Sequence, residues 1–412
     1  MNRKLKTRNS KPSRGDAERA GQSPETILLA VTGMSPAVIT ETVWALAHES
    51  EPILPHRVIA ATTSVGREEI RRQLFEPLAR FGHRTAWETL RAALAAEGFE
   101  LTGRLRFGIT GDDVRVLTTA DPASGRSREL ADIRSPADNQ AAADFLLETV
   151  RGIVENPDTR LIASLAGGRK TMGALLYACM TLAGRETDRL THVLVNEPFE
   201  NLREFFFPCQ PGGPFPRSTR AAPSVASGQS AAFDPATAVV DLADVPFVPL
   251  RNLFVRELGR KAGSFHRLVE ICRSGLRRRA AENLRVSLDP QRAELEVNGA
   301  RFKLAPAEML VLLFLAHRAK QNEPAFAAYK DALDDLNTFR DKQRETQKDF
   351  TRWPQADSLR TPWDEREITR TVSDLRQKLR QQGGDASVLA ACLPEKGRCS
   401  LDLPGEMIHI KS

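Results

Sequence analysis

Apolar positions alternate between two kinds of segment over the first half of the chain. Short runs rich in β-branched residues, such as TILLAVTG (26–33) and TRLIASLA (159–166), are typical of strands buried on both faces. Longer helical patterns follow them, such as SPAVITETVWALAHE (35–49) and RKTMGALLYACMTLAG (169–184). Strands that alternate with helices indicate a parallel sheet covered on both faces. The sequence therefore predicts an α/β fold, a Rossmann-like domain over residues 24–208.

Other segments of this domain repeat the pattern. Further strands are expected at 56–64, 113–119 and 190–197, and further helices at 66–81 and 135–155. Ser135 precedes the long helix and is expected to be its N-cap.

The second half of the chain has a different pattern. Residues 209–236 are rich in Pro, Gly, Ser and Ala and are expected to form a linker or long loop, followed by a helical connector at 237–285. A separate domain is expected over residues 286–412. Its predicted elements are a hairpin at 293–304, a helix at 305–319, an amphipathic helix at 366–382 and a second hairpin at 393–404.

The order of these C-terminal elements resembles the winged helix-turn-helix of response regulators over about residues 286–410. Ile368, Val372, Leu375 and Leu379 would form the buried stripe of the amphipathic helix. The resemblance implies that this helix enters a DNA major groove and that the wing contacts backbone phosphate. The candidate DNA contacts are Arg370, Arg376, Lys396 and Arg398. The alternative is a solvated basic face on a dimerisation module, and the polar segment 320–364 is longer than the winged-helix family usually has.

Charge and composition narrow the class of protein. The formal charge of +6 is concentrated in residues 1–23, where seven Lys or Arg residues face two acidic ones, and this basic tail is expected to be disordered. No apolar run approaches the roughly 20 residues of a membrane span. Five cysteines are scattered without a CxxC pair, which favours reduced thiols and a cytoplasmic protein.

Two of the predicted strand-to-helix turns carry the chemistry expected of a ligand site. Ligands of open parallel sheets bind outside the carboxyl ends of the strands, where the turns TGMSPAV (32–38) and AGGRKTM (166–172) are expected. Glycines let backbone N–H groups approach a phosphate, and a helix start adds partial positive charge. Lys170 adds a full charge, Arg169 a bidentate fork and Ser35 a hydroxyl. The candidate ligand-binding residues are Thr32, Gly33, Met34, Ser35, Pro36, Gly167, Gly168, Arg169, Lys170 and Thr171.

The usual nucleotide signatures are absent from these turns. The spacing differs from the P-loop, no GxGxxG follows the first strand, and no acidic cluster typical of magnesium-dependent phosphoryl transfer is present. The sequence therefore predicts a phosphate ligand held without an obligatory metal or cofactor. The alternative is that the glycines form tight turns and that the lysine is simply solvated.

The two turns and their flanking segments resemble the CRISPR-associated Rossmann fold (CARF) domain over about residues 26–208. The most similar stretches are VTGMSPAVITETVWAL (31–46) and LAGGRKTMGALLYACMTLAGRETDRLTHVLVNEPFE (165–200). This resemblance implies a homodimer that binds cyclic oligoadenylates, the ring-shaped messengers of type III CRISPR systems. Several members of the family are ring nucleases, in which a Ser and a Lys at the positions of Ser35 and Lys170 are catalytic.

The function implied by this resemblance is binding and metal-independent cleavage of the ring to linear products that end in a 2′,3′-cyclic phosphate. A two-fold dimer suits an even-numbered ring, so cyclic tetra-adenylate is the expected ligand and cyclic hexa-adenylate the second choice. One alternative is a transcription regulator that binds the ring without cutting it and binds DNA through the winged helix. Another is a nuclease effector activated by the ring.

Overall fold

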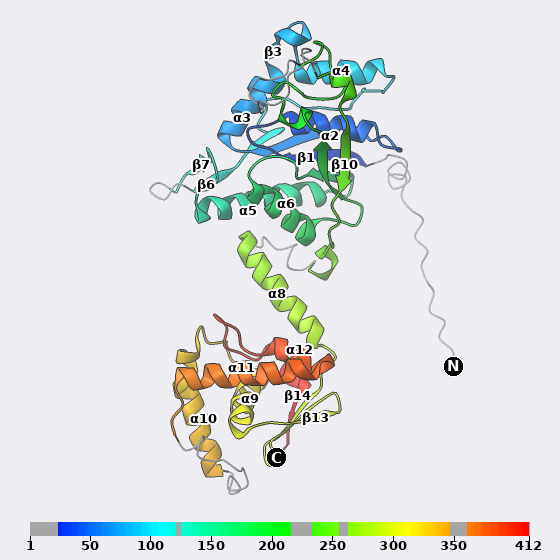
Figure 1. Cartoon of the computed structure of the whole chain (residues 1–412). Helices are drawn as coiled ribbons and strands as arrows, with labels where there is room; N and C mark the ends of the chain where they lie inside the picture. The colour runs from blue at the N-terminus through cyan, green and yellow to red at the C-terminus, as the bar shows by residue number, and fades with distance from the viewer. Residues whose placement is uncertain (1–23, 121–124, 216–232, 255–262, 347–360, 412) are drawn as a thin grey trace, which may run out of the picture. The chain divides into compact units, whose positions relative to one another are not determined.

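The computed structural model describes residues 24–120, 125–215, 233–254, 263–346 and 361–411. The chain divides into two compact units, Met1–His266 and Arg267–Ser412. The expected basic tail at 1–23 and much of the expected linker at 209–236 lie outside the described residues. Each unit is described by itself below (Figure 1).

The first unit is built around a six-stranded sheet with the order β10-β9-β8-β1-β2-β5. Its strands are β1 (Glu25–Val31), β2 (Arg57–Thr62), β5 (Val114–Val116), β8 (Thr159–Ser164), β9 (Arg189–Val195) and β10 (Val240–Asp244). All neighbouring pairs are parallel except β9 and β10. In the middle of the sheet, Leu28 of β1 pairs with Ile162 on one side and Val58 on the other. The predicted Rossmann-like α/β fold is therefore confirmed.

Helices cover both faces of this sheet. They are α2 (Ala37–Ala47), α3 (Ser64–Ile70), α4 (Ala86–Ala96), α5 (Pro136–Val154) and α6 (Lys170–Ala183). Helices α2 and α4 lie on one face, and α5 and α6 pack together on the other (Figure 1). Ser135 caps α5 as expected, because its hydroxyl accepts a hydrogen bond from Asp138 N and the Asp138 carboxylate bonds back.

Three features of the first unit differ from the sequence prediction. The single helix expected at 66–81 ends as α3 and continues as a π-helical turn, Arg71–Phe75. Helix α4 was not predicted. Residues 240–244, which were assigned to the helical connector, instead form β10 as the antiparallel edge strand of the sheet. The boundary expected at 208 is therefore replaced by a unit that extends to His266.

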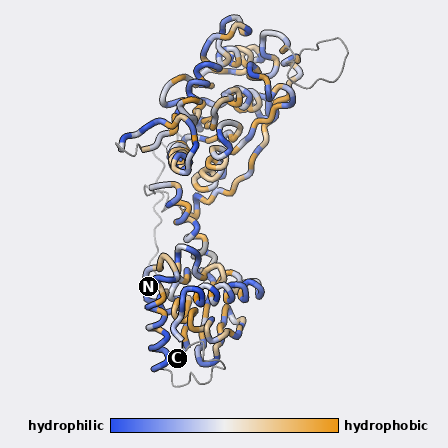
Figure 2. Tube along the Cα trace, turned by 60° about the vertical axis from the view of Figure 1, so that its left-hand side comes forward, coloured by the Kyte–Doolittle hydropathy of each residue, from blue (hydrophilic) through white to orange (hydrophobic). Residues whose placement is uncertain are grey.

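Short elements complete this unit. They are the two-stranded pairs β3 (Pro77–Leu78) with β4 (Arg84–Thr85) and β6 (Thr118–Ala120) with β7 (Ser127–Glu129), and the 3-10 turns Ala79–Phe81, Phe199–Asn201, Pro235–Thr237 and Arg251–Leu253. The core lies between the sheet and the helices, and α2 is buried on nearly all sides. Figure 2 shows hydrophobic stretches inside each unit and hydrophilic ones along outer helices.

The second unit combines a small sheet with helices. Its sheet has the order β13-β12-β11-β14. The strands are β11 (Val286–Asp289), β12 (Glu294–Val297), β13 (Ala300–Lys303) and β14 (Ile408–Ile410), and the helices are α8 (Phe265–Ala281, which begins in the first unit), α9 (Pro306–Lys320), α10 (Leu333–Thr346), α11 (Glu365–Gln382) and α12 (Gly384–Cys392). Two 3-10 turns, Tyr329–Ala332 and Gly405–Met407, complete it. The predicted hairpin at 293–304 is confirmed, as is the buried stripe of α11.

The second hairpin, expected at 393–404, is not formed as two strands. The structure has a tight turn with one bridge between Glu395 and Arg398, in which Gly397 has φ +88. Pro394 and Pro404 have no N–H group to donate to a longer ladder. The sheet is completed instead by β14, which pairs parallel to β11.

Candidate functional site

The two predicted ligand turns lie next to each other at the carboxyl edge of the first sheet. One follows β1 and the other follows β8, and these strands are paired in parallel register up to Ala30 and Ser164. The turn after β2 lies on the other side of the β1 turn, because β1 pairs with β8 on one side and with β2 on the other. Three strand-to-helix turns therefore line up at this edge.

Glycines allow these turns to touch. A Cβ atom added to Gly33 would lie 3.1 Å from Gly168 Cα, and one added to Gly167 would lie 2.6 Å from Val31 O. Gly168 also has φ +77, a conformation that residues with a side chain rarely adopt. On the other side, a Cβ atom on Gly66 would lie 3.3 Å from Gly33 Cα. The glycines are therefore required by close backbone contact, not only by local turn geometry.

The turn after β8 presents hydrogen-bond donors that the protein leaves free. Within the described part of the chain, no group accepts a hydrogen bond from the backbone N–H of residues 167–171. Arg169 is the N-cap of α6, and its side chain does not cap the helix. The helix therefore begins with unpaired donors and its partial positive charge directed at the turn, an arrangement suited to an anion.

The proposed catalytic side chains are both accessible at this edge. Ser35 and Lys170 are exposed, and neither side chain has a partner among the residues that the structure describes. Met34 is also exposed, and its carbonyl accepts a hydrogen bond from Gln73 Nε2 at 3.1 Å. Thr32, in contrast, is buried and donates to Ser35 O at 3.3 Å, so it supports the turn.

The remaining candidates have structural roles as well. Pro36 is buried and is the N-cap of α2, whereas Thr171 is exposed in the first turn of α6. The Arg169 guanidinium is engaged by the Asp132 carboxylate, with Nε to Oδ1 at 2.9 Å and a second contact from Nη2 to Oδ2. These hydrogen bonds from Arg169 hold the pKa of Asp132 well below its usual range. The Arg169 guanidinium, which was expected to bind a ligand, is therefore already paired with a carboxylate of the protein.

Sequence reasoning missed one unusual group close to the first turn. Glu41 lies in α2, is buried, and has no hydrogen-bond or ion-pair partner among the described residues. Burial raises its pKa to about 8, because the charged carboxylate would lose its hydration. The only sequence signal is that the residues three and four positions away on the helix, Ala37, Val38, Trp44 and Ala45, are all apolar.

The four candidate DNA contacts of the second unit fall into two groups. Arg370 is exposed on α11, with Asp374 Oδ2 3.7 Å from its Nε, and Lys396 is exposed at the tight turn. Arg376 instead donates to the carbonyls of Leu393 and Pro394. Arg398 donates to Ser274 Oγ at 2.7 Å and to Asp402 Oδ1 at 3.2 Å. The structure thus uses Arg376 and Arg398 to tie elements of the unit together.

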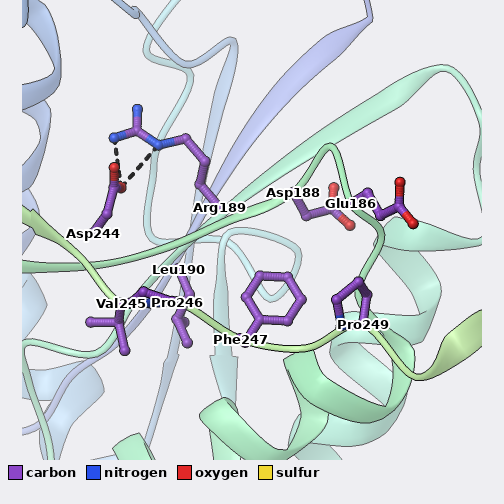
Figure 3. Close-up of a pocket in the computed structure, with 9 residues that line it drawn as sticks. All are labelled: Glu186, Asp188, Arg189, Leu190, Asp244, Val245, Pro246, Phe247 and Pro249. Carbon is purple, nitrogen blue, oxygen red and sulfur yellow. Dashed lines mark hydrogen bonds and ion pairs between the residues drawn. The ribbon is translucent and has the colours of Figure 1, made fainter.

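A pocket of about 310 Å³ lies at the opposite, amino edge of the first sheet. Figure 3 shows Arg189 at the start of β9 directed at Asp244 at the end of β10. Arg189 also binds Glu49 through two contacts of 2.9 Å, and Asp188 is paired with Arg185. The buried Asp188 and the partly buried Arg189 of this pocket are thus paired within the protein, unlike the donors at the carboxyl edge.

The described residues contain neither a candidate metal site nor a membrane-spanning helix. No group of three or more His, Cys, Asp and Glu side chains in that part of the chain is placed to hold a metal ion. In the same residues, no helix combines the length and the apolar character needed to cross a membrane.

The fold and the turns define a Rossmann-like α/β protein whose carboxyl sheet edge carries backbone donors without a partner in the described residues. The family model of CRISPR-associated protein NE0113 (Cas_NE0113) matches residues 35–271, which is more than half of the chain. The chain therefore belongs to this family of CRISPR-associated proteins. No curated protein matches it.

Proposed function

We propose that the first unit binds a cyclic oligoadenylate, most favourably cyclic tetra-adenylate, at the carboxyl edge of its sheet and cleaves it. The observation that carries this proposal is the contact between the Gly33 and Gly168 turns, which brings the unpaired N–H groups of residues 167–171 beside the turn that carries Ser35. A CRISPR-associated family supports a ligand of this class. A two-fold homodimer would present these turns twice around one ring.

The chemistry needs no protein nucleophile. The ribose 2′-oxygen attacks the adjacent phosphorus, a 2′-O–P bond forms, and the bond from phosphorus to the 5′-oxygen breaks. The 2′-hydroxyl loses its proton to water and the departing 5′-oxygen gains one. Ser35 would orient the phosphate or the 2′-hydroxyl. Lys170 and the backbone N–H groups would stabilise the negative charge that grows on the phosphate oxygens.

Single-turnover cleavage of labelled cyclic tetra-adenylate in EDTA tests this function. Wild-type protein should give linear adenylates that end in a 2′,3′-cyclic phosphate, identified by mass. Ser35→Ala should slow cleavage more than it weakens binding, because a hydroxyl contributes orientation more than charge. Ligand binding should also raise the melting temperature by mass action. No thermal shift with any cyclic oligoadenylate, or cleavage that requires Mg²⁺, would contradict the proposal.

A second candidate is a regulator that senses the ring and binds DNA through a winged helix in the second unit. It is favoured by the exposed Arg370 on the amphipathic α11 and by the exposed Lys396 at the tight turn. Binding to promoter DNA should then weaken steeply with salt, and replacing both residues by Ala should lower the salt slope by about 2. Salt-insensitive binding, or none, would favour a dimerisation module.

A further inference from the structure

A short acidic segment contacts two of the three turns at the carboxyl edge. We call residues 129–132 the acidic strap. Its backbone is fixed at Leu130, which is buried, donates to Leu117 O at 2.8 Å and accepts from Ser64 N at 2.9 Å. Ser64 begins α3, so the strap is attached to the turn after β2. Two residues further on, Asp132 contacts Arg169 in the turn after β8.

Each carboxylate of the strap binds an arginine beside one of these turns, Arg67 in α3 and Arg169 at the N-cap of α6. Glu129 accepts two hydrogen bonds from Arg67, at 2.6 Å from Nη1 and 2.8 Å from Nη2. Asp132 accepts two from Arg169. Arg67 directly follows Gly66, and Arg169 directly follows Gly168, the two glycines that contact the Gly33 turn from either side. The two arginines therefore flank the turn that carries Ser35.

The geometry of both pairs suits an exchange of anions. A guanidinium donates two parallel N–H bonds equally well to a carboxylate or to a phosphate. Both arginine side chains are about half exposed, so a ligand can reach them from solvent. Ion pairs of this exposure contribute little net stability. A phosphate that also binds the free N–H groups of residues 167–171 can therefore replace a strap carboxylate.

We propose that Arg67 and Arg169 are phosphate contacts of the ligand site, and that Glu129 and Asp132 occupy them until ligand phosphates displace the carboxylates. This inference rests on the proposed function for the identity of the ligand, but its chemistry requires only a phosphate chain. It adds Arg67 to the site and makes the strap an internal competitor that weakens binding of isolated anions.

Calorimetry with inorganic tripolyphosphate at low salt tests the competition directly. Glu129→Gln and Asp132→Asn keep the shape of each side chain and remove its charge. Each should raise the affinity about twofold to fivefold, the range expected for loss of a partly exposed ion pair. Arg67→Ala and Arg169→Ala should lower it. Asp113→Asn is the matched control, because Asp113 pairs with Arg57 at 2.8 Å at the other edge of the sheet, and it should change nothing.

Parallel titrations with cyclic tetra-adenylate separate this inference from the proposed function. If the variants change the affinity for tripolyphosphate as expected but the ring does not bind, the exchange of anions is supported and the proposed ligand is wrong. If the ring binds but the strap variants weaken or do not change the affinity for both ligands, the strap merely positions the arginines and the exchange is overturned. All variants share residues 1–23, so the basic tail contributes equally throughout.

Discussion

The two edges of the first sheet differ in whether their polar groups are paired within the protein. At the amino edge there is a pocket of about 310 Å³, yet its Arg189 is bound by both Glu49 and Asp244. At the carboxyl edge, Lys170 and the N–H groups of residues 167–171 have no partner in the described chain. The candidate site is therefore assigned from unpaired donors and not from cavity volume. Three pairs of substitutions, each a test variant with its control, can break or sharpen this comparison.

The largest difference is expected between Lys170→Ala and Asp244→Asn. Loss of the Lys170 charge should slow ring cleavage by about a hundredfold to a thousandfold, as for other preorganised contacts of a transition state. Binding should weaken too, since the same charge holds the ground state. Asp244→Asn, at the amino edge, should leave the single-turnover rate unchanged. Equal effects of the two variants would place the active site elsewhere.

The next effect concerns buried carboxylates and is measured as the change in the free energy of unfolding with pH. The pKa of Glu41 is raised to about 8 in the folded protein, above its unfolded value, so its protonated form favours folding at low pH. That stabilisation should be lost as the pH rises from about 5 through 8. Gln does not ionise, so the free energy of unfolding of Glu41→Gln should not fall over this pH range. Above pH 8 the variant should be more stable than wild type by about 2–4 kcal/mol, since one pKa unit corresponds to about 1.4 kcal/mol.

Asp188 provides the control for Glu41, because it is equally buried but paired. Its carboxylate accepts from Arg185 at 2.8 Å and from Leu161 N at 3.0 Å. Asp188→Asn should therefore destabilise the protein, the opposite of the effect expected for Glu41→Gln. Denaturant unfolding between pH 5 and 9 measures both. If the stability of the wild-type protein does not fall over this range, the expectation that ionisation of Glu41 destabilises the fold is wrong.

The smallest effect is expected for the glycine contacts. Gly167→Ala would place a methyl group 2.6 Å from Val31 O, so the two turns must separate, at a cost of about 1–3 kcal/mol. Gly152→Ala is the control, because that glycine lies in α5 with open space around it and should gain about 0.5–1 kcal/mol. Thermal unfolding compares the two. A Gly167→Ala protein as stable as wild type would mean that the turns are not in close contact.

Local patterns predicted five of the six strands of the first sheet but not β10, the antiparallel edge strand. The strands near β1 and β8 are continuous apolar runs, so their burial and parallel pairing followed from sequence. Strand β10 reads Val-Asp-Leu-Ala-Asp and is only partly buried, and its pairing with β9 depends on a contact distant in sequence. Helix α12 and strand β14 are short, and short segments carry a weak periodic signal.

The candidate site was predictable where its chemistry is local. Glycines, Lys170 and Ser35 belong to two contiguous turns, and strand order brings the turns together. Arg169 forms an ion pair with Asp132, and Arg376 donates a hydrogen bond to the carbonyl of Pro394. The partners lie 37 and 18 positions apart in the chain, so no motif spacing predicts either contact. Glu41 was missed because its unusual property arises from burial, not from a motif.

The pairing of β11 with β14 constrains when the second unit can form during synthesis. These two strands are the first and the last of the unit in sequence, yet they are neighbours in its sheet. The hairpin of β12 and β13 can assemble early, but the open edge of β11 stays unpaired until residues 408–410 have left the ribosome. Until then, a nascent chain exposes a strand edge that can pair with other chains.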